Sequence, residues 1–174
     1  FNLAKIDISK NKLTYIPDEL FQIVGANLIE FNGGFNRLAF VPESISLLTG
    51  LKQLNLNNNK LTRLPIILPS RLTYLDLRCN KLSNTFSSKS TSKDKLLSDM
   101  LANLPTLEVL LLGYNQLLAF PMPIAATLRH LELGNNQIRY LPDEFVNNKQ
   151  CQNKLELLDI SNNNIKNINP KLGN

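Results

Sequence analysis

The chain contains few of the residues that build disulfide frameworks, metal sites and most catalytic centres. Among its 174 residues there are two cysteines and one histidine. No apolar run approaches the ~20 residues of a membrane-spanning helix, and the first residues do not form a signal-peptide pattern. The sequence also lacks zinc-site Cys/His spacing, a G-x-S-x-G motif and a G-x-x-x-x-G-K-S/T phosphate loop. These absences exclude a disulfide-rich domain, a membrane span and the common hydrolase and nucleotide-binding motifs.

Two further absences indicate the cellular compartment. None of the 24 asparagines begins an Asn-x-Ser/Thr glycosylation sequon. The two cysteines, Cys79 and Cys151, are not expected to pair, because they fall at different places in the repeats described below. Both features are typical of reducing surroundings, so we expect an intracellular, cytoplasmic protein.

A repeated pattern of leucines and asparagines runs through the whole chain. It has the form LxxLxLxxNxL, in which Leu51, Leu54, Leu56 and Asn59 are one example. Successive repeats begin 25, 23, 21, 35, 21 and 27 residues apart. One departure is Gly33, which stands at the third apolar place of the second repeat and predicts a local irregularity. The seven repeats begin with residues 3–11, 28–36, 51–59, 72–80, 107–115, 128–136 and 155–163.

A period of this length predicts a stack of short parallel strands. One such strand cannot bury its apolar side or pair its backbone alone, so neighbouring repeats must stack. The alternating apolar residues point into the core, and the residues between them line the inner wall of the stack. We expect strands near residues 4–9, 29–34, 52–57, 73–78, 108–113, 129–134 and 156–161.

An asparagine follows each strand, where the chain turns away from the sheet. Its amide can both donate to and accept from backbone groups that would otherwise be buried without partners. We therefore expect the seven asparagines to form a ladder. They are Asn11, Asn36, Asn59, Asn80, Asn115, Asn136 and Asn163.

This pattern resembles the leucine-rich repeat superfamily over nearly the whole chain. The resemblance implies an α/β solenoid, a horseshoe with a parallel sheet on its concave face and short helical, 3-10 or extended convex segments. Residues 16–20, Ile-Pro-Asp-Glu-Leu, look like the intracellular repeats of Ras-pathway scaffolds. Residues 64–75 are instead similar to the LPxxLPxxLxxL repeats of bacterial effectors that enter host cells. The paired prolines of the two short repeats predict extended outer segments.

One convex segment, at residues 83–106, is longer than its counterparts. Its first part is polar and is expected to form a loop. Its second part places apolar residues at helical spacing, which predicts a helix over residues 93–104, with Ser92 as its N-cap and Pro105 to stop it. The segment is either a tolerated surface insertion or a regulatory docking loop.

The chain is expected to form one domain, residues 1–174, of about seven repeats. Its first repeat starts at Leu3 and little follows the last one, so we expect a fragment of a larger protein. We also expect a monomer without metal or cofactor. If the protein is a bacterial effector, its catalytic domain lies outside this chain.

Catalysis within the chain is not expected. His130 is the only histidine, and we expect it on the inner wall of repeat six. A nucleophile at Cys79 would need this imidazole within roughly 3 Å. Repeats four and six are two strand spacings apart, roughly 10 Å, so the two side chains should not form a dyad.

The inner wall of repeats four to six is the candidate binding surface for another protein. Aromatic and aliphatic side chains gather there beside charged ones, as in the anchor of a protein interface. Gly113 and Gly134 are expected to leave room for the partner. The competing interpretation is that Val109 and Leu111 only pack against neighbouring side chains. The candidate residues are Tyr74, Asp76, Arg78, Val109, Leu111, Tyr114, His130 and Glu132.

A basic flank, where the strands leave the wall, is a second candidate surface. Its charge suits phosphorylated partners, phosphoinositide or RNA. We expect a solvated flank instead, without nucleic acid or phosphoinositide, because the sequence does not show the exposed aromatics typical of single-strand binding. The flank residues are Lys12, Arg37, Lys60, Arg63, Lys81, Arg139 and Lys166.

Overall fold

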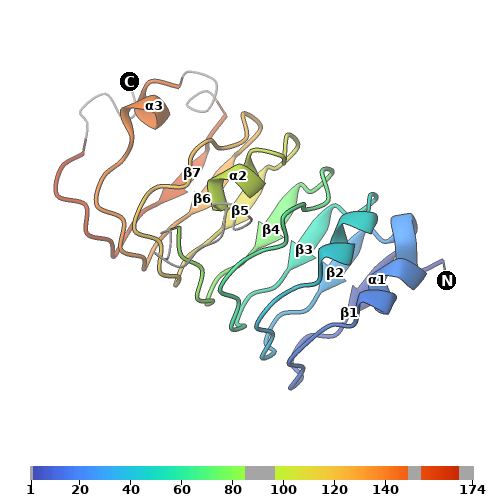
Figure 1. The fold of residues 1–174 in the computed structure, drawn as a ribbon. Coiled ribbons are helices and arrows are strands. Elements are labelled where there is room, and N and C mark those ends of the chain that lie inside the picture. Colours follow the sequence, from blue (N-terminus) through green and yellow to red (C-terminus); the bar gives the residue numbers. More distant parts are fainter. Residues whose placement is uncertain (1, 85–96, 149–153, 169–174) are drawn as a thin grey trace.

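A computed structural model describes residues 2–84, 97–148 and 154–168. Seven strands lie side by side in one parallel sheet, in the order of the sequence (Figure 1). The sheet confirms the α/β solenoid that the repeats predict. The strands are β1 (Lys5–Asp7), β2 (Glu30–Asn32), β3 (Gln53–Asn55), β4 (Tyr74–Asp76), β5 (Val109–Leu111), β6 (His130–Glu132) and β7 (Leu157–Asp159).

Each strand is shorter than the six-residue segment expected, although backbone pairing continues beyond it. The N–H of Asn58, for example, donates to the Arg78 carbonyl of the next repeat at 2.8 Å. Five strands end in Asp or Asn, whose side chain accepts the N–H two residues on, as Asp7 does from Ser9 at 2.9 Å. This local bond is an alternative to strand pairing. It therefore helps to end the regular strand early.

A residue in the left-handed backbone conformation follows each strand at the eighth place of the repeat. The φ angles lie between 50° and 58°, and none of these residues is glycine. Asparagine tolerates this conformation, whereas a bulky side chain there is strained. The turn therefore has a fixed geometry that residue type does not alter. The seven residues are Lys10, Phe35, Asn58, Cys79, Tyr114, Asn135 and Asn162.

The irregularity expected at Gly33 does not occur, so that prediction is wrong. The N–H of Gly33 donates to the Asn55 carbonyl at 2.8 Å, as in a regular repeat. A Cβ atom on Gly33 would lie 3.1 Å from the Phe31 ring and 3.3 Å from Leu56. The Phe31 ring also packs edge-on against Phe21, with ring centroids 5.3 Å apart. A larger side chain at one apolar place thus fills the space left at the next.

The convex segments differ from repeat to repeat (Figure 1). Three of their helices begin directly after a proline and have acidic residues in the first turn, which suits the positive end of the helix dipole. Residues 56–73 and 112–129, in the two short repeats, contain no helix, as their prolines predict. The helices are α1 (Asp18–Val24), η1 (Gly25–Asn27), η2 (Glu43–Leu47), α2 (Leu97–Leu101) and α3 (Asp143–Val146).

The helix predicted over residues 93–104 lies only partly within the described residues. Helix α2 ends three residues earlier than expected, and the Leu104 N–H then donates to the Leu101 carbonyl at 3.1 Å in a tighter turn. The apolar residues 97, 100, 101 and 104 of the predicted helix are buried in the common core. Ser92 and the predicted polar loop fall outside the described residues.

The asparagine at the ninth place joins its own repeat to the preceding one. The Nδ2 of Asn80 donates to the carbonyls of Leu56 and Leu77, both at 3.0 Å, and its Oδ1 accepts the Leu61 N–H at 2.9 Å. Five further asparagines bond in the same way. Asn11, in the first repeat, bonds only to carbonyls of its own repeat.

Replacing a ladder asparagine should destabilise the fold strongly. Asn80→Leu leaves three carbonyls and one N–H without their side-chain partner, which should lower the free energy of unfolding by about 2–4 kcal/mol. Asn11→Leu is the matched control and should lower it by less than about 1 kcal/mol, because Asn11 is exposed. Urea unfolding followed by circular dichroism measures both. Equal losses in the two variants would contradict the ladder's role between repeats.

Candidate functional site

Strand register brings an aromatic and aliphatic row together on the concave face. Tyr74 on β4, Val109 on β5, His130 on β6 and Leu157 on β7 are successive pairing partners. The first three are partly exposed and Leu157 is 44% exposed. Tyr114, beyond the end of β5, is 58% exposed. The same row on β1 to β3 is polar or charged, so apolar surface is confined to the later repeats.

A charged network lies beside this row. The Asp76 carboxylate is 1% exposed and accepts hydrogen bonds from Asn57 Nδ2 at 3.0 Å and from Arg78 Nε and Nη2 at 3.0 and 2.8 Å. Arg78 Nη1 also lies 3.4 Å from the Glu132 carboxylate on β6. Hydrogen bonding to Asp76 raises the pKa of Arg78, so the guanidinium stays charged. The buried carboxylate is thereby paired and fully hydrogen-bonded.

Leu111 is not an exposed contact residue, so that part of the predicted surface is wrong. It is only 5% exposed, although it points to the concave side and lies outside the main core. Its pairing partners are Asp76 on β4 and Glu132 on β6, and the ion pair between Arg78 and Glu132 spans its strand. The ion-paired side chains of Arg78 and Glu132 cover the shorter side chain of Leu111. The packing interpretation holds for Leu111, whereas Val109 remains partly exposed.

Gly113 and Gly134 do not leave room for a partner. A Cβ atom on Gly113 would lie 2.5 Å from Glu132 Oε1, and one on Gly134 would lie 2.8 Å from Asp159 Oδ2. Carboxylates of the next strand therefore occupy the space above both glycines. The expectation fails because the sequence does not show which side chain leans over which neighbour.

The geometry offers no catalytic pair at Cys79 and His130. Cys79 follows β4 and His130 lies on β6, with β5 between them. Cys79 is a free thiol, and burial raises its pKa, which disfavours the nucleophilic thiolate. Cys151 falls outside the described residues, so its expected lack of pairing stays a prediction.

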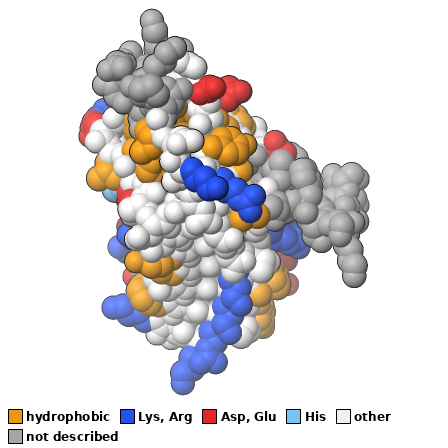
Figure 2. Space-filling view, turned by 90° about the vertical axis from the view of Figure 1, so that its left-hand side faces the viewer, with side chains coloured by type: hydrophobic (Ala, Val, Ile, Leu, Met, Phe, Trp, Pro, Cys, Tyr) orange, Lys and Arg blue, Asp and Glu red, His pale blue; other side chains and the backbone are white. Residues whose placement is uncertain are grey.

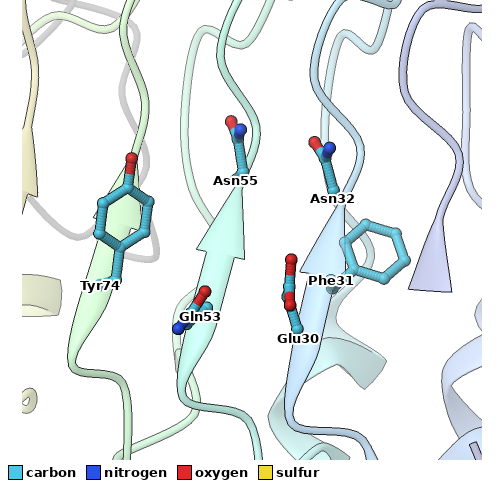
Figure 3. A pocket seen from close by; sticks show the side chains of 6 residues that line it. All are labelled: Glu30, Phe31, Asn32, Gln53, Asn55 and Tyr74. Atoms are coloured by element: carbon cyan, nitrogen blue, oxygen red, sulfur yellow. The ribbon is translucent and has the colours of Figure 1, made fainter. Parts of the chain in front are cut away.

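A polar depression, which sequence reasoning missed, lies on β2 to β4 (Figure 3). It has a volume of about 200 Å³, and burial raises the pKa of Tyr74 at one end of it. Glu30, at the other end, forms an ion pair with Lys5 at 2.8 Å. The uninterrupted polar residues of repeats two and three are the signal that could have found it. Its lining residues are Glu30, Phe31, Asn32, Gln53, Asn55 and Tyr74.

The predicted basic flank divides into two parts. Lys12, Arg37, Lys60 and Lys81 occupy the tenth place of the first four repeats, and Arg63 lies close by at the thirteenth place of the third. Repeats five to seven have Gln116, Gln137 and Asn164 at the tenth place. Arg139 and Lys166 stand at the twelfth place of the last two repeats, so repeat five separates them from the rest.

Two further features concern residues 2–84, 97–148 and 154–168. No group of three or more His, Cys, Asp or Glu side chains in these ranges could hold a metal ion. None of the helices found there is long and apolar enough to cross a membrane.

Comparison with known proteins agrees with the fold. The sequence model of the Leucine Rich Repeat family matches residues 50–70, 71–91, 127–148 and 154–174. The chain belongs to the leucine-rich repeat superfamily. Each of the four matched segments contains one strand and the ladder asparagine that follows it. The seven-stranded parallel sheet is the concave sheet of this leucine-rich repeat domain.

Relatives of the leucine-rich repeat domain include receptors and other repeat proteins. It is 28% identical to human Toll-like receptor 8, over 92% of this chain and 18% of the receptor. It is 30% identical to rat lumican, over 80% of this chain and 46% of lumican. A solved structure, the ectodomain of the membrane receptor kinase GASSHO1/SCHENGEN3 from Arabidopsis thaliana with CASPARIAN STRIP INTEGRITY FACTOR 2, is similar with a TM-score of 0.68. That match has 25% identity and covers 95% of this chain and 19% of the receptor chain. The domain thus spans less than half the length of these proteins.

An arginine at Leu111 should disrupt the charged network and the packing. Leu111→Arg places a cation at a buried position beside Arg78, and we expect the free energy of unfolding to fall by about 2–4 kcal/mol. Leu157→Arg is the control, because this leucine is exposed, and its loss should stay below about 1 kcal/mol. Urea unfolding of both variants measures the difference. If Leu111→Arg were as stable as the wild type, Leu111 would be exposed and could contact a partner.

Proposed function

We propose that this leucine-rich repeat domain is a non-catalytic, monomeric module that binds another protein with the concave face of β4 to β7. One observation carries the proposal, the row formed by Tyr74, Val109, His130 and Leu157 on four neighbouring strands. At ~4.8 Å per strand, the row is about 14 Å long. Grouped aromatic and aliphatic side chains of this kind suit the anchor of a protein interface.

The charged network supports the same surface. Arg78 is held by Asp76 at two nitrogen atoms and reaches Glu132, so its guanidinium is already positioned before a partner arrives. A side chain ordered in the free protein loses little further freedom on binding. Charges fixed beside an apolar row also set the orientation of the partner. The names of the relatives, which include a receptor and a receptor kinase, agree with a recognition role.

The cellular setting is a further proposal. Two cysteines and the absence of an Asn-x-Ser/Thr sequon support an intracellular location. The effector-like sequence of residues 64–75, and the lack of a helix there, support a second candidate, a domain that selects the target of a bacterial effector. In both cases the concave face would contact the partner, and any catalytic activity would lie elsewhere in the protein.

Peptide selection tests the concave row directly. We expect phage-displayed random dodecapeptides selected on the immobilised domain to bind Leu157→Arg about tenfold more weakly than the wild type, because the apolar anchor gains a charge. Gln53→Arg also introduces an arginine in this row, but on β3, and it should leave the affinity for the selected peptides unchanged. Fluorescence anisotropy with the selected peptides measures both. Weakened binding in Gln53→Arg alone would move the site to the polar depression and contradict the proposal.

A further inference from the structure

The edge of the sheet where the strands end carries a column of basic side chains. Lys12, Arg37, Lys60 and Lys81 lie there, one in each of the first four repeats, and all are exposed. The backbone N–H of each of the last three donates to the repeat before it at 2.8–2.9 Å. The backbone positions of these residues therefore follow one another at ~4.8 Å intervals. Figure 2 shows Lys and Arg side chains in such a column low on this face, with hydrophobic side chains on both sides.

The positive charge of this column is not neutralised within the part of the chain that the structure describes. The ion pairs found there involve Lys5, Arg78 and Arg129, none of which belongs to the column. Asp18 and Glu43 lie further along the chain, at the starts of α1 and η2. The Glu43 carboxylate faces the Ile66 N–H, which donates to it at 2.8 Å. The column is thus available to an anionic ligand.

Exposed aromatic rings border the column on two sides. Tyr15 and Phe40, at the thirteenth place of the first two repeats, are 61% and 47% exposed. Each directly precedes a buried residue, Ile16 or Val41, which holds the ring at this edge. Phe35, at the eighth place, is 50% exposed. The expectation that this flank lacks exposed aromatics is therefore wrong, because exposed rings stand two places before and three places after the cations of the tenth place.

Phe35 shares the left-handed backbone of the eighth place, which all seven repeats adopt. Its φ of 54° lies in the left-handed region, where a bulky residue is strained. Asparagine occupies the same place in three other repeats and tolerates that conformation. A half-exposed phenylalanine contributes little core packing to offset this strain. Tyr114 occupies the same place in repeat five, so this strain is common to the repeats and does not by itself mark a binding site.

We propose that this edge, formed by Lys12, Arg37, Lys60, Lys81, Tyr15, Phe35 and Phe40, binds single-stranded nucleic acid. Four cations in a row contact successive phosphates of one strand, which rises about 3.4 Å along its axis per stacked nucleotide. The bases stack on the aromatic rings beside the cations. A duplex buries its base faces, and a lipid headgroup has none, so neither would use the aromatic rings. The proposal does not depend on the concave row, which lies on the strands themselves and shares only repeat four with the column.

Binding can be tested with a fluorescein-labelled ten-nucleotide oligouridylate or oligothymidylate. Anisotropy titrations of the whole domain should show binding whose logarithmic salt slope is about −3, as expected when four phosphates are neutralised. Arg37→Gln with Lys60→Gln should reduce this slope by about 1.4. The double variant Lys52→Gln with Arg71→Gln removes equal charge from exposed positions outside the column and should keep the slope.

Aromatic variants test base stacking separately from charge. Tyr15→Ala with Phe40→Ala should weaken oligonucleotide binding about tenfold or more, while binding of inorganic polyphosphate stays unchanged. Tyr140→Ala is the matched control, because Tyr140 occupies the thirteenth place of repeat six, is 59% exposed and lies outside the column, with Gln137 at the tenth place of its repeat. All replaced side chains are exposed, and thermal melting followed by circular dichroism should show unchanged folding.

Three outcomes would overturn the proposal. The first is no detectable oligonucleotide binding at 50 mM salt. The second is equal affinity for a single strand and its duplex, or for oligonucleotide and polyphosphate, which would identify a general polyanion surface. The third is an unchanged affinity in the folded Tyr15/Phe40 double variant. Binding to phosphoinositide vesicles with the same dependence on the column, but none to oligonucleotide, would assign the edge to a membrane surface instead.

Discussion

The hydrogen bonds of the asparagine ladder are the interaction on which the rest of the structure depends. At the end of each strand the chain turns inward, and carbonyl and N–H groups of two adjacent repeats would be buried without partners. One amide, as at Asn80, donates to three carbonyls and accepts one N–H. Leaving such groups unpaired in a buried turn would cost more than most single packing contacts contribute. Every repeat is therefore held to the one before it in the same geometry.

This constraint separates the two faces of the molecule. Repeats begin between 21 and 35 residues apart, yet every strand is paired in the same register with the next. Length differences are taken up on the convex side, where helix, 3-10 and extended segments alternate. The concave face and its edge remain regular columns. A binding surface can thus change along the stack through single residues without any change in the backbone.

Lateral contact between columns then decides which side chains face solvent. Glu132 leans over Gly113, and its ion pair with Arg78 spans the strand that carries Leu111. The covered leucine and the small glycine form the base of a charged network, while Tyr74 and His130 stand in the neighbouring row. The apolar row belongs to the later repeats and the basic column to the earlier ones. One solenoid therefore presents two surfaces of different chemistry.

The sequence by itself determined the repeats, the parallel strands, the inward leucines and the asparagines of the ladder, because each of these depends on spacing along one repeat. The extended outer segments of the short repeats also followed from their prolines. The exposure of side chains on the concave face did not follow from the sequence. Leu111 and Gly113 are set by the lengths of side chains on other strands, and Gly33 is accommodated by the ring of Phe31. Only the tertiary structure shows that Tyr15, Phe35 and Phe40 stay exposed near the basic column, and the cations of different repeats become neighbours only after the repeats stack.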